Sequence, residues 1–152
     1  MNTKQVIQSQ YLAALGMLKQ VIVQCPEALW YAPGNQDRFW RKSYHALFYA
    51  HLYLQNVEKD FVLWEKHHDP DGEEPFTKDE VLEYLSFVEK QVLDRIPATD
   101  LNAESGFHWL PFNKLELQFY NIRHIQQHVG ELYERLGTHE NIELGWISTG
   151  TS

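Results

Sequence analysis

Helical spacing of apolar residues is the feature that most restricts the fold of this 152-residue chain. Four segments place apolar residues at intervals of three and four, as an amphipathic helix does, and no stretch alternates apolar and polar residues like a strand. The four segments are residues 4–24, 37–60, 77–96 and 113–136. No repeat or domain linker separates them, so they predict an all-α fold, a four-helix bundle that forms a single domain over residues 1–152.

Capping residues mark several of the predicted helix ends. Thr77 with Glu80 forms a capping box before the third segment, and Asn113 with Glu116 resembles a second one. Gly137 is a normal stop for the fourth helix, and we expect the tail after it to be loosely ordered. The predicted loops are residues 25–35, 65–76 and 98–112.

The second helical segment, which begins near Asp37 and ends near Asp60, is apolar nearly all round. A helix without a wide polar face is usually buried on more than one side. We therefore expect a homodimer in which a second subunit covers one apolar side of this helix. Its two apolar sides are formed by Trp40, Leu47 and Leu54, and by Phe48, Tyr49 and Leu52.

Composition and charge exclude several classes of partner. The formal net charge is −8, whereas nucleic acid and anionic membranes both require a basic face. We see no apolar run near the roughly 20 residues that span a membrane, and no signal peptide. Cys25 is the only cysteine, so it forms no intrachain disulfide and is interpreted as a small structural residue. These features predict a protein of the cytoplasm.

Two histidines in the fourth segment have the spacing of metal ligands. His124 and His128 are four residues apart on a predicted helix, so both imidazoles lie on one face and can chelate one divalent ion. A third ligand from the second segment would leave open positions for water or substrate, as in catalytic zinc sites. His45 and His51 both lie there, about 120° apart around the helix, and the residues alone leave the choice open.

Other polar residues near these histidines are candidates for supporting or catalytic roles. Tyr44 and Tyr49 lie beside His45 in sequence, and Glu131 follows His128 by three residues. A ligating imidazole normally donates its second N–H to a carboxylate or carbonyl, so Glu131 is a candidate partner or catalytic base. An exposed helical glutamate explains its position equally well. In the acidic loop, His67 and His68 are interpreted as solvated residues.

Two segments resemble the DinB-like superfamily, also described as YfiT-like metal-dependent hydrolases. They are Tyr-His-Ala-Leu-Phe at residues 44–48 and the stretch at residues 117–132 that contains Arg-His-Ile-Gln-Gln-His-Val-Gly. Many relatives follow the last histidine with Arg-Gly-Gln, where this chain has Val129, Gly130 and Glu131. This chain therefore lacks the arginine that those relatives have after the last histidine.

The resemblance implies a ligand set, a topology and a chemistry. It assigns the metal to His45, His124 and His128, and implies a long crossover between the second and third helices near residues 65–76. It also implies frequent homodimers, zinc or nickel as the metal, and enzymes that join low-molecular-weight thiols to small electrophiles. We expect a metal-dependent hydrolase or thiol transferase, with Glu131 and Tyr49 as catalytic candidates. The alternative is a non-catalytic dimeric bundle with a structural or incidental metal, or a small-ligand-binding role.

Overall fold

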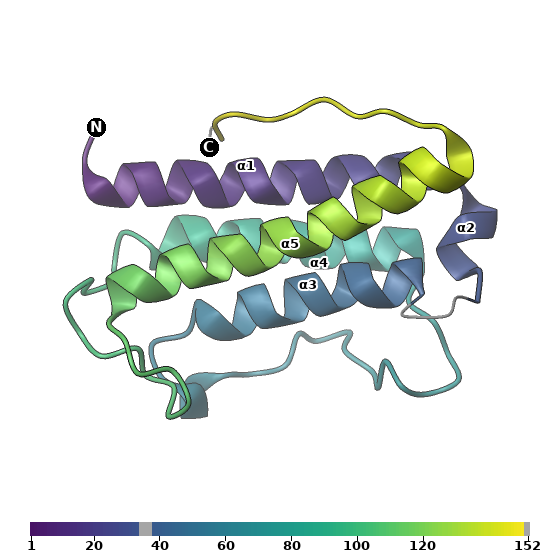
Figure 1. Ribbon diagram of the computed structural model, residues 1–152. Helices are drawn as coiled ribbons and strands as arrows, with labels where there is room; N and C mark the ends of the chain where they lie inside the picture. The colour runs from purple at the N-terminus through teal and green to yellow at the C-terminus, as the bar shows by residue number, and fades with distance from the viewer. Residues whose placement is uncertain (34–37, 151–152) are drawn as a thin grey trace.

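The computed structural model describes residues 1–33 and 38–150, and within them it is all-α (Figure 1). Four long helices and the short α2 pack against one another, and the described residues contain no strand, only an isolated bridge between Glu104 and Asn113. The all-α prediction is confirmed. The elements are α1 (Thr3–Gln24), α2 (Glu27–Tyr31), α3 (Phe39–Tyr53), the 3₁₀ helix η1 (Glu58–Asp60), α4 (Lys78–Arg95) and α5 (Lys114–Glu140).

The four long helices are arranged so that α1 and α3 each pack against both α4 and α5. Helices α3 and α4 run in the same direction, and α1 and α5 run in the opposite one (Figure 1). Two consecutive parallel helices need a connection that returns along the bundle. Residues 54–77 make this return beside α3, and we call their central part, residues 61–76, the crossover segment.

The crossover segment covers the second apolar side of α3. Phe61 packs against Phe48, with ring centroids 5.3 Å apart, and the ring of Phe76 stacks on Tyr44 at 4.0 Å. The same segment reaches α4, where Trp64 stacks on Tyr84 at 4.6 Å. The two-sided apolar pattern of α3 is thus partly explained within one chain. A homodimer stays a prediction, but the pattern that motivated it has a second cause.

Most helix ends follow the capping residues. At α4, the Thr77 side chain accepts from the Glu80 amide and Glu80 reaches back to the Thr77 amide, which confirms the predicted capping box. The predicted end of the second helical segment is wrong. Helix α3 ends at Tyr53, and its predicted beginning at Asp37 lies outside the described residues. Buried Lys114 donates to the carbonyls of Gln55 and Asn56 and so stabilises the chain where it leaves the helix.

The structure also differs from the sequence prediction at the C-terminal end of the chain. Helix α5 continues through Gly137 to Glu140, and Asn141, with φ of 53°, adopts the left-handed conformation that ends it. Asparagine tolerates this conformation better than most residues, so it replaces the glycine stop. The described part of the tail after α5, which we expected to be loosely ordered, has no regular secondary structure but contacts α1. Residues 142–150 lie along α1 (Figure 1), and the Gly150 amide donates to the Ser9 carbonyl at 3.0 Å.

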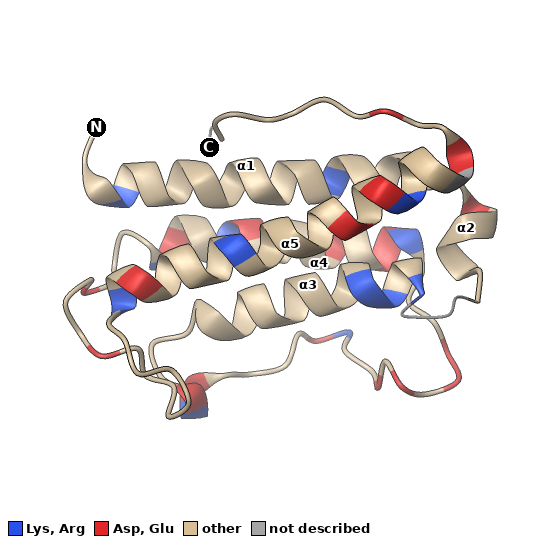
Figure 2. Cartoon of the chain, viewed as in Figure 1, with Lys and Arg blue, Asp and Glu red and all other residues tan. Residues whose placement is uncertain are grey.

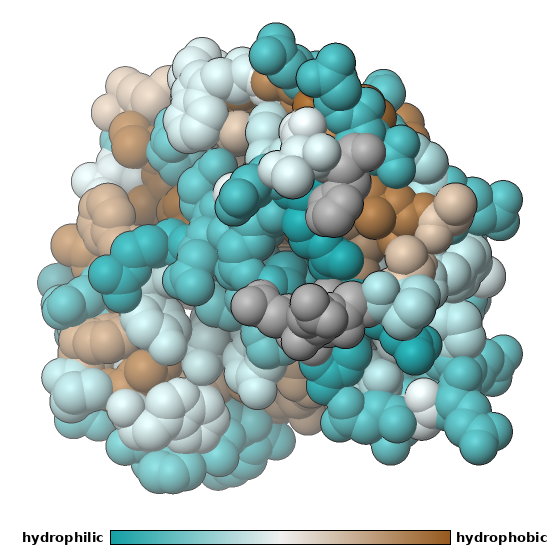
Figure 3. All heavy atoms as spheres, turned by 45° about the vertical axis from the view of Figure 1, so that its right-hand side comes forward, coloured by the Kyte–Doolittle hydropathy of each residue, from teal (hydrophilic) through white to brown (hydrophobic). Residues whose placement is uncertain are grey.

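Helix α1 carries few charged residues (Figure 2). By length and composition alone it is long and apolar enough to cross a membrane, which our sequence analysis did not anticipate. A buried core helix passes the same test, and 56% of the most apolar stretch of α1 is buried inside the structure. On the face shown in Figure 3, hydrophobic residues of the described chain lie in small separate groups among hydrophilic ones.

Candidate metal centre

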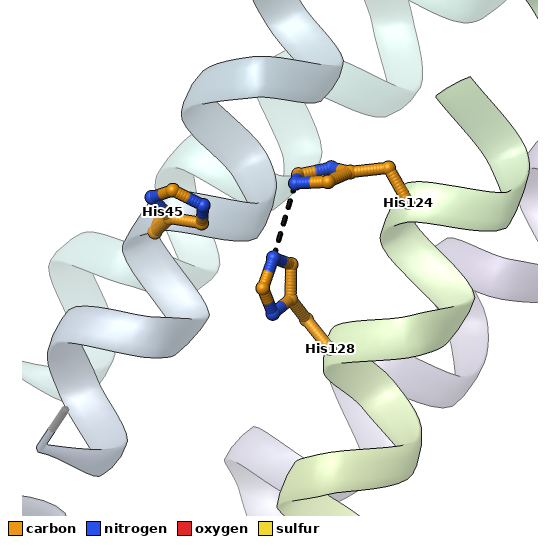
Figure 4. Close-up of side chains that lie close together, drawn as sticks. All are labelled: His45, His124 and His128. Carbon is orange, nitrogen blue, oxygen red and sulfur yellow. Dashed lines mark hydrogen bonds between the residues drawn. The ribbon is translucent and has the colours of Figure 1, made fainter. Parts of the chain in front are cut away.

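Three histidines meet between α3 and α5. His45 projects from α3, and His124 and His128 project from successive turns of α5 toward it (Figure 4). One nitrogen from each ring lies within 4.8 Å of the other two, and all three side chains are half-buried. The Nε2 atoms of His124 and His128 are 3.0 Å apart. Two imidazole nitrogens at this distance can both lie about 2.1 Å from one ion, so the donor set fits a divalent metal.

The packing of α3 on α5 brings these rings together. Ala46 and Ala50 are fully buried on α3, and their small side chains let α5 approach closely. Asn121 of α5, also fully buried, donates from Nδ2 to the Ala50 carbonyl at 3.2 Å and so fixes the register of the two helices. His45 directly precedes Ala46, and His124 lies one turn after Asn121. The histidines therefore lie beside a tightly packed, register-defining contact.

His51 lies on another side of α3 and is not part of this cluster. It is buried, and its Nδ1 lies 2.9 Å from the hydroxyl of Tyr84 on α4. Burial, reinforced by the charge of Arg95, lowers the pKa of His51 to about 4. Of the two histidines between which the sequence left the choice open, His45 lies with the α5 pair and His51 faces α4.

Glu131 holds His128 in one orientation. Its Oε1 lies 3.1 Å from Nδ1 of His128, so that nitrogen carries the proton and Nε2 keeps the lone pair that a metal requires. Lys42 of α3 donates to the other carboxylate oxygen. Burial tends to raise the pKa of Glu131, but the hydrogen bonds and charges of Lys42 and His128 together outweigh it, and the pKa is lowered. A carboxylate–histidine pair of this kind usually supports a metal ligand.

Sequence reasoning missed Lys42. Its side chain is only 8% exposed and reaches across the helix interface to Glu131. The signal was present in the spacing, because Lys42 precedes His45 by three residues and so shares its side of α3.

His124 is neutral in this environment. Burial lowers its pKa to about 4, with a further contribution from the neighbouring His128 and His45. A neutral imidazole binds metal without first losing a proton at pH 7. Its Nδ1 is buried, and none of the described residues pairs with it. The orientation of His124 therefore depends on packing, whereas that of His128 depends on a carboxylate.

Tyr49 forms an aromatic wall beside the cluster. Its ring centroid lies 4.8 Å from that of His45 and 5.7 Å from that of His124. Tyr44, the other tyrosine candidate, lies on the crossover side, where its hydroxyl bonds Nδ1 of His67. The structure thus brings Tyr49 and Glu131 to the three histidines, while a catalytic role for either stays a prediction.

The remaining sequence candidates lie elsewhere. His68 stacks on Phe76, with ring centroids 3.8 Å apart. Cys25 is buried at the C-terminal end of α1, and burial raises the pKa of its thiol to about 12. The thiol is therefore protonated at neutral pH, which agrees with a structural role.

Comparison of the chain with models of protein families, with curated proteins and with solved structures finds no match. The resemblance to the DinB-like superfamily therefore rests on the two segments quoted for it and on the three-histidine cluster.

Proposed function

We propose that His45, His124 and His128 bind one divalent metal, zinc or nickel, and that the protein is a metal-dependent hydrolase or thiol transferase. The observation that carries this proposal is the convergence of three imidazole nitrogens, within 4.8 Å of one another, from two packed helices. The cluster that the described residues form has three members. Catalytic zinc sites use three protein ligands, whereas structural ones are closed by four.

The chemistry follows from the donor set. Bound to three neutral imidazoles, a divalent ion supplies its full positive charge, which favours the deprotonated form of a water or a thiol cosubstrate at neutral pH. The protein contributes orientation and polarity. Glu131 orients the His128 ring through its carboxylate, and Tyr49 lies against His45 as an aromatic surface beside the cluster. The substrate in this proposal is a small electrophile.

Membership of the DinB-like superfamily is part of the proposal. It is supported by the histidine positions on α3 and α5 and by the parallel arrangement of α3 and α4 (Figure 1). With it we propose a cytoplasmic homodimer that acts on small molecules and does not bind nucleic acid or membrane. Light scattering at micromolar concentration tests the dimer, and a strictly monomeric mass would contradict it.

Metal stoichiometry tests the site. Protein washed with chelator and reloaded with zinc or nickel should retain one ion per chain, measured by elemental analysis. His124→Ala should lose this ion. His51→Gln, which changes a buried histidine on the other side of α3, should keep it. Equal stoichiometry in the wild type and His124→Ala would overturn the site.

Activity tests the chemistry. Metal-loaded and metal-free protein should be compared on panels of esters, amides and thiol-plus-electrophile pairs. We expect at least one panel member to turn over faster with metal, and His128→Ala to lower that rate by orders of magnitude. If metal accelerates none of these reactions although it binds, a structural or ligand-binding bundle replaces the enzyme.

A further inference from the structure

A cavity of about 280 Å³ borders the histidine cluster on the side of the crossover segment. His45 belongs to both, since its ring lines this cavity and also faces the two α5 histidines. The volume is near the lower limit for small-molecule sites, so it suits a ligand with a single ring. A molecule bound in this cavity would lie next to His45.

The walls of the cavity are aromatic. Phe48 and Tyr49 come from α3, and His67 comes from the crossover segment. The ring centroids of Phe48 and His67 are 5.7 Å apart, and those of Phe48 and Tyr49 are 5.5 Å apart. Rings at this spacing pack against one another and form an apolar wall against which a flat apolar group can lie.

An ion pair stands at one end of this cavity. Arg41 of α3 bonds the carboxylate of Asp71 in the crossover segment, and both residues line the cavity. The Asp71 side chain is 71% exposed, whereas that of Arg41 is 31% exposed. An exposed loop carboxylate is easily displaced, because exposed ion pairs contribute little to stability. Asp71 therefore marks where another carboxylate would bind.

We propose that this cavity binds a small aromatic carboxylate, whose carboxylate replaces Asp71 on Arg41 and whose ring lies against Phe48, Tyr49 and His67. Arg41 and His45 are one turn apart on α3, which places the anchor and the cluster roughly 6 Å apart along the helix. A substituted benzoate spans this distance. The inference rests on the proposed function, because it defines the substrate class of the same centre.

Titration of the zinc-loaded protein with 4-fluorobenzoate, monitored by fluorine NMR, tests this inference. Arg41→Gln should weaken binding by about tenfold, since a charge-assisted hydrogen bond is lost. Asp71→Asn should strengthen it several-fold by removing the competing carboxylate. Arg38→Gln, which removes the same charge from an exposed position before α3, should leave the affinity unchanged.

A neutral probe and the metal content complete the test. We expect 4-fluorobenzyl alcohol to bind more weakly, with an affinity that Arg41→Gln does not alter. Lack of 4-fluorobenzoate binding, or equal losses in Arg41→Gln and Arg38→Gln, would overturn the inference. Zinc content measured on the same samples separates the two proposals. If the protein binds zinc but not 4-fluorobenzoate, only the proposed cavity ligand is contradicted. If it binds 4-fluorobenzoate but not zinc, the proposed metal site is contradicted.

Discussion

At the scale of single residues, His51 is a buried and His124 a half-buried imidazole, and both are neutral in the folded chain. Burial lowers the pKa of each to about 4, whereas an unfolded histidine titrates near 6.5. Between these two pH values the unfolded chain binds protons that the folded chain does not. The stability that these two neutral imidazoles contribute is therefore fully present above pH 6.5, and it is lost as the pH falls toward 4.

We expect His51→Gln to reduce this loss. The unfolding free energy of metal-free wild type should fall more steeply than that of the variant, by up to about 1.4 kcal/mol per pH unit between pH 6.5 and 4. Above pH 7 the unfolding free energies of the wild type and the variant should change in parallel with pH. Urea denaturation in the presence of a chelator measures both. Identical slopes below pH 6.5 would show that His51 is charged in the fold.

Lys42 provides a second prediction at this scale. Because it fixes the carboxylate that orients His128, Lys42→Met should weaken zinc binding by about 10- to 100-fold, the usual cost of losing a partner behind a metal ligand. Lys42→Arg should restore most of the affinity. Lys90→Met, which removes an exposed ion pair with Asp94, should have no effect. Competition with a chromogenic chelator measures the three variants.

The candidate site was predictable from the sequence only in part. The spacing of His124 and His128 predicts a shared helix face, because i and i+4 positions are neighbours on any helix. The choice between His45 and His51 depends on which side of α3 meets α5, and the apolar residues on both sides of that helix conceal it. The contact between Lys42 and Glu131 joins residues 89 positions apart, which no local pattern reveals.

At the scale of secondary structure elements, α5 contains an unfavourable glycine. Gly130 lies inside the helix, and a β-carbon added there would meet nothing within 4 Å. We expect Gly130→Ala to raise the unfolding free energy by about 0.5–1 kcal/mol, because alanine loses less backbone entropy in a helix. Urea denaturation measures the change. A loss of stability instead would indicate a partner packed closely on this face of α5.

Two glycines in the tail form a matched pair. A β-carbon at Gly150 would lie 2.3 Å from that of Leu12, whereas one at Gly145 would meet nothing within 4 Å. Gly150→Ala should therefore displace the end of the tail from α1, and Gly145→Ala should not. Hydrogen exchange of the last residues should become faster only in Gly150→Ala. Equal protection in both variants would mean that the tail does not pack on α1 as described.

The elements were predicted as well as their local signals allowed. The Thr77 capping box gave the beginning of α4 because the signal is wholly local. Gly137 was misread as a stop, since only the position of Asn141 and the packing of the tail decide where α5 ends. Helix α2 was missed within a predicted loop, because five residues show too little periodicity to be recognised.

At the scale of the whole molecule, a bound metal would join α3 to α5, two helices far apart in sequence. Zinc at about 100 times its dissociation constant should stabilise the fold by about 2.7 kcal/mol, which corresponds to a rise in melting temperature of roughly 5–10 °C. Calcium should leave the melting temperature unchanged, because it prefers oxygen ligands. Differential scanning calorimetry compares the two ions. Equal responses to both would contradict an imidazole site.

The three histidines all belong to one chain. A centre shared between subunits loses its ion on dilution, because mass action separates the subunits. Here one chain supplies all three rings, so in the proposed site α3 and α5 would form an intramolecular chelate. Occupancy should follow the concentration of free metal alone. In a cell that makes little of this protein, each chain would still bind its ion as readily as in a concentrated sample, whether or not it pairs with a second copy.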